Sequence, residues 1–116
     1  MSAFGGALKE LYQGQLSNVL GTLYTAPAQP PNTQTNVYSL WVCNTDSAAH
    51  TFTLRFGGGT AADSLFDGAT IAANTTVQVD ANTCLAVVPA GTTIQGNADA
   101  ASKVTVSVYG EEITAS

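Results

Sequence analysis

Residues 104–109 read Val-Thr-Val-Ser-Val-Tyr, which is the clearest alternation of apolar and polar side chains in this chain. Successive side chains of a β-strand point to opposite faces of the sheet, so the alternation predicts a strand with one buried face. We expect this strand to run from Lys103 to Glu112. Alternating runs of the same kind occupy residues 37–44, 50–57, 76–80 and 92–96.

Turn-forming residues separate these runs at short intervals. Gly, Pro, Asn and Asp interrupt the chain between them, as is typical of tight connections between strands. About eight to nine short antiparallel strands predict an all-β fold, a single β-sandwich or jelly-roll domain over residues 20–116. No stretch predicts a substantial helix. Shorter strand pieces are expected at 22–25, at 65–66 and 69–71 on either side of an Asp67-Gly68 turn, and at 85–88.

The run at 37–44 is expected to be a central strand, because both of its faces are largely apolar. The turn residues 44–47 follow it, and the next run alternates Phe52, Leu54 and Phe56 with polar side chains. We therefore expect the two runs to pair as a hairpin.

The first 19 residues are the least strand-like part of the chain. Gly5, Gly6 and Gly14 disfavour a helix, and the polar residues around them favour no element. We expect residues 1–19 to form an extended arm that docks on a neighbouring molecule, with a short helical turn, a first edge strand or a disordered terminus as alternatives. The candidate contact residues of this arm are Phe4, Leu8, Leu11, Tyr12 and Leu16.

Charged residues are scarce in this chain. Apolar residues make up 45% of it, but Asp, Glu, Lys and Arg only 9%, against about 25% in an ordinary soluble protein. Small uncharged residues must therefore cover the surface, which suits a protein that is covered by copies or partners, a monomer with an uncharged surface being the alternative. The net charge is −5 with three fixed cations, so we expect no direct binding to nucleic acid.

Membrane and export signals are not found in the sequence. No apolar run approaches the roughly 20 residues of a membrane span, and the start lacks the basic and apolar regions of a signal peptide. We expect no membrane contact and a chain made and kept in the cytoplasm, at least until assembly or lysis.

The sequence offers little for catalysis or cofactor binding. His50 is the single histidine and begins a strand beside a turn, where we expect it to be exposed and bound to solvent. Cys43 and Cys84 are the two cysteines; we expect buried thiols, with a disulfide formed after release from the cell left open. Gly57–Gly59 lacks the lysine of a phosphate-binding loop. We predict no catalytic, cofactor-binding or metal-binding residue, and no enzyme.

Two alternatives come from the acidic and aromatic residues. The aspartates lie mostly beside turns, where their side chains bond the nearby backbone, and a calcium site built from Asp63 and Asp67 is the alternative. Trp41 lies in the most apolar run, which favours a core or interface position over a sugar-binding platform. A carbohydrate-binding module therefore stays among the functional hypotheses.

Four stretches give the chain a resemblance to a group of small virion proteins of tailed bacteriophages. They are Leu-Tyr-Gln-Gly-Gln-Leu at 11–16, Thr-Leu-Tyr-Thr-Ala-Pro at 22–27, Val-Cys-Asn-Thr at 42–45 and Val-Thr-Val-Ser-Val-Tyr-Gly-Glu at 104–111. With the alanine- and glycine-rich middle, the resemblance spans nearly the whole chain. The Pro30-Pro31 loop departs from the group's pattern, which leaves the shape of that loop open.

The resemblance implies a β-sandwich structural protein of the virion, assembled in the host cytoplasm, with no catalytic residues and no cofactor. The first role that it implies is a capsid decoration or cement protein. Such a protein would bind the major capsid protein and copies of itself, with trimers at local threefold points as the expected arrangement. A tail or fibre component that contacts the host surface is the alternative.

Overall fold

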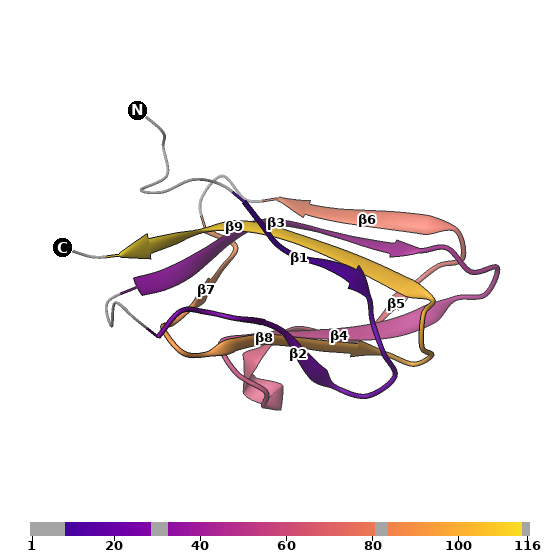
Figure 1. The fold of residues 1–116 in the computed structure, drawn as a ribbon. Coiled ribbons are helices and arrows are strands. Elements are labelled where there is room, and N and C mark those ends of the chain that lie inside the picture. The colour runs from indigo at the N-terminus through magenta and orange to yellow at the C-terminus, as the bar shows by residue number, and fades with distance from the viewer. Residues whose placement is uncertain (1–8, 29–32, 81–83, 115–116) are drawn as a thin grey trace.

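The computed structural model describes residues 9–28, 33–80 and 84–114. Within this part of the chain, nine strands and one short 3-10 turn form two antiparallel sheets packed face to face (Figure 1). The predicted all-β sandwich is therefore confirmed, and no described helix is long and apolar enough to cross a bilayer. The elements are β1 Lys9–Gln15, β2 Gly21–Thr25, β3 Thr33–Asn44, β4 His50–Phe56, η1 Ala61–Asp63, β5 Ser64–Ile71, β6 Thr75–Asp80, β7 Ala86–Val88, β8 Thr93–Ala98 and β9 Val104–Thr114.

The strand order is that of a jelly roll. One sheet runs β1-β9-β3-β6, with β7 also paired to β3, and the other runs β2-β8-β4-β5. Along β3, residues 39–44 pair with β6 and residues 35–37 pair with β7, so β6 and β7 are two halves of one interrupted edge strand. Counted that way, the sandwich has the two four-stranded sheets of a jelly roll.

The predicted hairpin between β3 and β4 is wrong. β3 pairs with β9 on one side and with β6 and β7 on the other, whereas β4 lies in the second sheet between β5 and β8. The turn after β3 therefore carries the chain from one sheet to the other. Alternation shows that each run has a buried face, but it does not say which strand lies beside it.

The segment after η1 also differs from the expected pair of short pieces. β5 is one strand that continues through Asp67 and Gly68. Its register against β4 shifts between Phe52 and Leu54, and Gly68 has a φ of 63°. The irregularity that the Asp-Gly pair predicted is thus absorbed inside a strand, because glycine adopts a positive φ without a steric penalty.

The core lies between the two sheets and follows the alternation. Val104, Val106 and Val108 of β9 are fully buried, as the sequence predicted. Leu40 and Val42 of the central strand β3 lie in the same core cluster, and residues of the second sheet complete it. The buried residues contributed by β4, β5 and β8 are Phe52, Leu54, Phe56, Ile71, Ile94 and Ala98.

The structure places much of the predicted arm inside the sandwich. Residues 9–15 form β1, which pairs with β9, and Leu16 is 1% exposed in the core. Leu11 also packs against the core, and Tyr12 is half-buried on β1. Residues 9–19 are therefore an integral part of the domain, because the side of β9 that faces β1 needs a partner strand. Residues 1–8, with Phe4 and Leu8, lie outside the described residues, as does the Pro30-Pro31 loop.

Candidate interaction surfaces

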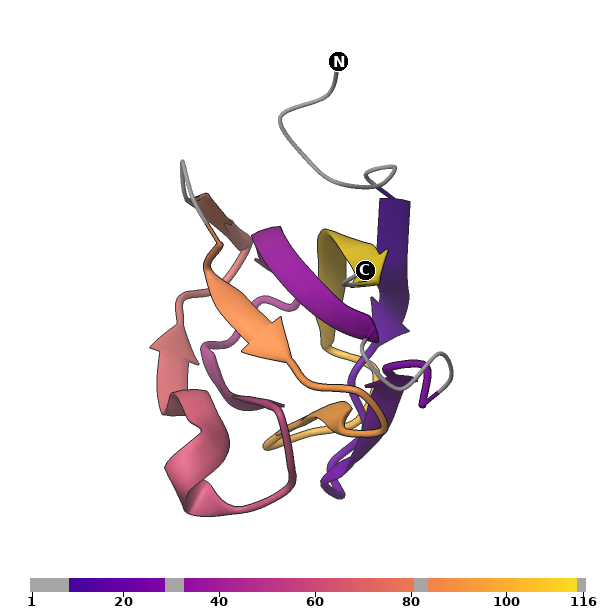
Figure 2. The ribbon, with the colours of Figure 1, turned by 90° about the vertical axis from the view of Figure 1, so that its left-hand side faces the viewer.

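The two long sides of the sandwich differ in how they are closed. On one side the chain passes directly from β1 to β2, and this link is bonded to both sheets. The Leu16 amide donates to the Val104 carbonyl at 2.8 Å, and the Ala98 amide donates to the Ser17 carbonyl at 2.8 Å. The opposite side lies between the edge strands β5 of one sheet and β6 and β7 of the other (Figure 2).

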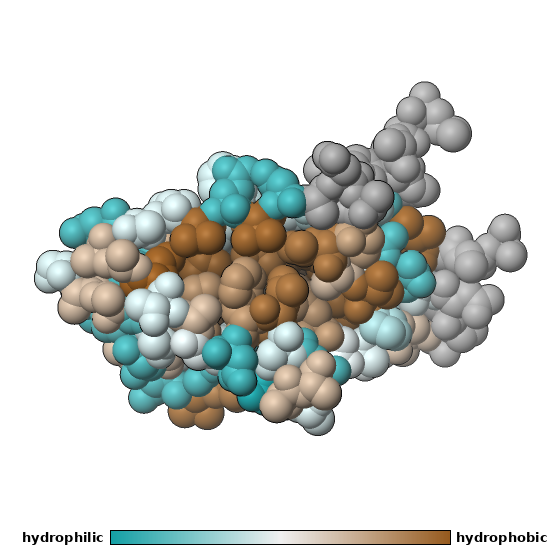
Figure 3. Space-filling view, turned by 180° about the vertical axis from the view of Figure 1, so that it is seen from behind, coloured by the Kyte–Doolittle hydropathy of each residue, from teal (hydrophilic) through white to brown (hydrophobic). Residues whose placement is uncertain are grey.

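Apolar residues are exposed along that opposite side. Figure 3 shows a hydrophobic stripe that runs lengthwise between two hydrophilic bands. Leu65 of β5, Val77 of β6 and Val87 of β7 are 40%, 36% and 44% exposed. Val77 pairs with the buried Val42 and lies on the core-facing side of its sheet, whereas Val87 lies between Ala86 and the buried Val88 and points to the outer face. We call the side of the sandwich that is bounded by β5, β6 and β7 the open side. Covering such residues stabilises a complex by roughly 25 cal/mol per Å² of apolar area removed from water, so a continuous stripe is a candidate contact surface.

Trp41 lies on the outer face of the first sheet. Its neighbours in β3, Leu40 and Val42, are fully buried, so Trp41 points away from the core and is 46% exposed. Its register partners are Gln78 on β6 and Ser107 on β9. This exposure rules out a core position for Trp41. We interpret Trp41 as part of a contact surface for a partner or a ligand.

The two cysteines are free thiols, each half-buried. Leu85, which follows Cys84, donates its amide to the Val37 carbonyl at 2.7 Å. Val37 is six residues from Cys43 along β3, or about 20 Å of extended chain. A disulfide needs Cα atoms within about 7 Å, so the two cysteines do not bridge within one chain of this fold.

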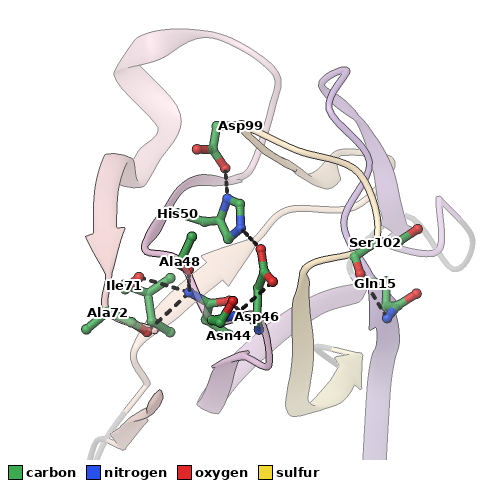
Figure 4. A network of polar contacts seen from close by, with 10 residues as sticks. Gln15, Asn44, Asp46, Ala48, His50, Ile71, Ala72, Asp99 and Ser102 are labelled. Atoms are coloured by element: carbon green, nitrogen blue, oxygen red, sulfur yellow. Dashed lines mark hydrogen bonds and ion pairs between the residues drawn. The ribbon is translucent and has the colours of Figure 1, made fainter. Parts of the chain in front are cut away.

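His50 is held between two carboxylates, which corrects the expectation of a solvent-bonded side chain. Its Nε2 lies 2.7 Å from Asp46 Oδ2 and its Nδ1 lies 2.8 Å from Asp99 Oδ1, and the side chain is 11% exposed (Figure 4). The hydrogen bond to Asp46 raises the pKa of His50 above its usual value; desolvation opposes the rise and Asp99 adds to it. The same contact lowers the pKa of Asp46.

Asn44 organises the same end of the sandwich. It is fully buried, and its Nδ2 donates to the carbonyls of Ala48, Ile71 and Ala72 at 2.9, 3.2 and 3.2 Å (Figure 4). Its Oδ1 accepts the Asp46 amide at 3.0 Å. One side chain thus joins the turn after β3 to the end of β5. This explains the Cys-Asn-Thr stretch: the asparagine satisfies backbone groups where the chain changes sheets.

A second polar cluster joins the sheets near the C-terminal end of β9. The Tyr24 hydroxyl donates to Glu112 and lies 2.9 Å from Thr35 Oγ1, and Lys9 Nζ lies 2.8 Å from Glu112 Oε1. Burial, followed by the hydrogen bond to Glu112, raises the pKa of Tyr24 to about 12. Burial alone would raise the pKa of Glu112, but the bonds from Lys9 and Tyr24 lower it overall.

Glu111 lies in the same part of β9, although nothing in the sequence pattern predicted that it would be buried. Its carboxylate accepts a 2.8 Å hydrogen bond from the Tyr38 hydroxyl, and the residue is fully buried. Burial, followed by this bond, raises the pKa of Tyr38. The Tyr-Gly-Glu-Glu run was expected only as the end of a strand. The signal that could have revealed its role is a pair of acids in a segment with apolar neighbours on both sides.

The proposed calcium ligands have other roles or positions. Asp63 Oδ2 accepts from the Thr60 amide at 3.1 Å and from the Thr60 hydroxyl at 2.8 Å, which caps the η1 turn. Asp67 lies within β5. Among the described residues, no group of three His, Cys, Asp or Glu side chains is placed to bind a metal ion, and no pocket is found.

Comparison with known proteins gives one likeness in structure. No family model matches the chain, and no curated protein matches it in sequence. A chain from Bacillus endospore appendages, which are described as disulfide-linked pili, superposes with a TM-score of 0.52 at 12% identity. The match covers 100% of this chain and 97% of the other. At this identity the likeness shows a shared fold.

Proposed function

We propose that this protein is a structural component of a tailed-phage particle, and that it decorates the assembled capsid. In this role it binds the major capsid protein and copies of itself, stabilises the lattice, and performs no catalysis. The phage assignment rests on the resemblance of the four sequence stretches. The association with partners rests on the surface of the fold.

The open side is the observation that carries the proposal. A single chain leaves Leu65, Val77 and Val87 exposed on the edge strands of this side. The whole chain has only three cations and eight acids, and one of the acids, Glu111, is buried. A partner that covers this side removes apolar area from water and separates few charges from their hydration shells. Contacts that are weak singly become stable when a symmetric lattice repeats them.

The structural likeness supports repeated assembly and adds nothing about the partner. The Bacillus chain with a similar fold comes from a pilus. A fold of this kind is therefore compatible with association into a large structure. The disulfides named for that pilus have no counterpart within one chain here, since Cys43 and Cys84 are both free.

Copy number in purified particles tests the proposal. We expect quantitative mass spectrometry of the phage that encodes this chain to find it near parity with the major capsid protein, or at a simple fraction of it. A handful of copies per particle would instead favour the tail or fibre role. Absence from the particle would contradict both roles.

Binding to capsids tests the surface that is used. Capsids stripped of this chain should rebind the wild-type protein and lose most of that binding with the double variant Leu65→Lys and Val87→Lys. Val19→Lys is the matched control, because Val19 is 68% exposed and lies in the link from β1 to β2, on the opposite side of the sandwich. Equal binding by all three proteins would exclude the open side as the contact surface.

A carbohydrate-binding module is the second candidate, and the exposure of Trp41 favours it. An exposed indole on a flat sheet face can stack against the apolar face of a sugar ring. If this role holds, a glycan array should show binding that Trp41→Ala abolishes, and Trp41 fluorescence should change with the bound glycan. A blank array, or binding unaffected by Trp41→Ala, would contradict it.

A further inference from the structure

The four edges of the two sheets are not equally protected against pairing with another strand. Natural proteins protect edge strands with charges, bulges, proline or short length. β1 carries Lys9 and Glu10 and has a register shift between Glu10 and Tyr12. β2 is five residues long, with a shift between Thr22 and Tyr24.

The edges nearer the open side differ from each other. β5 contains Asp67 and the positive-φ Gly68, and its register against β4 shifts twice. β7 is three residues long. β6 has none of these features: its six pairs with β3 follow without a shift, and its one charged residue, Asp80, stands at its end.

β6 also has an unpaired edge and an exposed apolar residue. In the described part of the chain β6 pairs with β3 and has no strand on its other side. Val77, at the middle of β6, is 36% exposed. A regular, nearly uncharged strand with free backbone donors and acceptors is the kind of edge to which a second strand adds.

We propose that β6 pairs antiparallel with β6 of a second copy of this chain, about a twofold axis at Val77. The β1-β9-β3-β6 sheets of the two copies then form one continuous sheet across the dimer. The partner strand is β6 itself because the other edges of the molecule are protected, and a surface that pairs with itself closes as a twofold dimer. This inference deepens the proposed function, since it names the surface through which copies associate.

The register follows from the two faces of the strand. Directly opposed residues share a face, so residues of the core-facing set must oppose one another. With Val77 opposite Val77, Thr75 opposes Val79 and Asp80 opposes Asn74. The two Asp80 residues are then six positions apart, or about 20 Å, which is twice the screening length of about 8–10 Å at physiological salt. The pairing therefore joins the two exposed valines without opposing like charges.

The size of the contact indicates its strength. Six residues of strand are about 20 Å long, so the pairing buries less than the ~800 Å² per partner of a standard stable interface. We expect a dimer whose population depends on protein concentration in solution and which becomes permanent when a lattice holds the copies together.

Disulfide trapping tests the register directly. Opposed residues in an antiparallel pair have Cα atoms about 4.5–5.5 Å apart, which a disulfide can bridge. In a Cys43→Ser, Cys84→Ser background, Val77→Cys should form covalent dimers on mild oxidation at least about tenfold faster than Val19→Cys. A mixture of Thr75→Cys and Val79→Cys should cross-link to each other more than either does to itself. Equal rates for Val77→Cys and Val19→Cys would overturn the proposal.

Solution mass provides the second measurement. We expect wild-type protein to approach twice 11.8 kDa by sedimentation as its concentration rises, and Val77→Lys to stay monomeric while keeping the folded circular dichroism spectrum of the wild type. Val19→Lys should dimerise like the wild type. A wild-type monomer at every concentration, a trimer, or a dimer that Val77→Lys retains would contradict the inference. The proposed function would survive such a result if the chain were still found in particles at high copy number.

Discussion

His50 bridges two turns by binding Asp46 through Nε2, at 2.7 Å, and Asp99 through Nδ1, at 2.8 Å. Asp46 follows β3 of the first sheet, Asp99 follows β8 of the second, and His50 itself begins β4. Both ring nitrogens carry protons only in the imidazolium form, which therefore binds both carboxylates best. The contact ties the two sheets together at one end of the sandwich.

This contact predicts that stability falls as the pH rises. The pKa of folded His50 is raised above 6.5, so its stabilisation is complete below that pH and is lost as the pH rises through the folded pKa. We expect the melting temperature to decrease from pH 6 to pH 9 in thermal unfolding followed by circular dichroism. His50→Gln should flatten this part of the profile. An unchanged slope in His50→Gln would assign the effect to another group.

At low pH the same contact predicts a second loss of stability, which comes from protonation of Asp46. The pKa of Asp46 is lowered below 3.8 in the folded state, so its contribution is present above that pH and is lost as the pH falls through the folded pKa. We expect Asp46→Asn to melt at a lower temperature than wild type at pH 5. Its melting temperature should also change less than that of wild type between pH 5 and pH 2. Ser47→Ala, at the neighbouring exposed turn position, should keep the wild-type profile.

Asn44→Ala should be strongly destabilising. The substitution removes the donor for three carbonyls and the acceptor for the Asp46 amide at a fully buried position. A buried hydrogen bond contributes about 1 kcal/mol net, and unpaired groups add a penalty, so we expect a loss of about 2–4 kcal/mol. Urea unfolding measures it, with Asn18→Ala at an exposed position as the control. A loss within 0.5 kcal/mol, the ordinary range of surface substitutions, would show that water replaces the side chain.

Gly110→Ala should disrupt the pairing of β9 with β3. A Cβ at this position would lie 2.2 Å from the Asn36 carbonyl oxygen and 2.9 Å from Leu11 Cδ1. Since the first contact is with backbone, the strands must move apart, and we expect a loss of about 3 kcal/mol or more. Gly21→Ala is the matched control, because its nearest contact would be an ordinary 3.8 Å. Equal melting temperatures for the two variants would contradict this geometry.

Two truncations test which of the first 19 residues the fold requires. Removing residues 1–8 should leave the sandwich folded, because the pairing of β1 with β9 begins at Lys9. Removing residues 1–19 should prevent folding, since it deletes β1 and the buried Leu16 together. The point variant Leu16→Ala should cost about 2–5 kcal/mol. A folded protein without residues 1–19 would show that β9 tolerates an open edge.

The strands and their buried faces could be read from the sequence because both are local properties. The valines of residues 104–108 point to one side by the two-residue period alone, and they are the core residues found in the structure. The interruption around Asp67 and Gly68 was also predicted, although the structure shows it as a shift of register within one strand. The polar clusters and the open side were less predictable, because they join residues far apart in the chain, such as Tyr24 and Glu112.

The amino-acid sequence is enough to predict one all-β sandwich with little charge on its surface. The folded structure was needed to see which strands are neighbours, and therefore that β1 closes one side while β5, β6 and β7 leave apolar residues exposed on the other. It was also needed to see that His50 meets Asp99, 49 residues away, and that β6 ends the sheet as a regular edge. This is because alternation records only whether a side chain faces the core, whereas pairing, register and edges depend on backbone hydrogen bonds that every residue except proline can make.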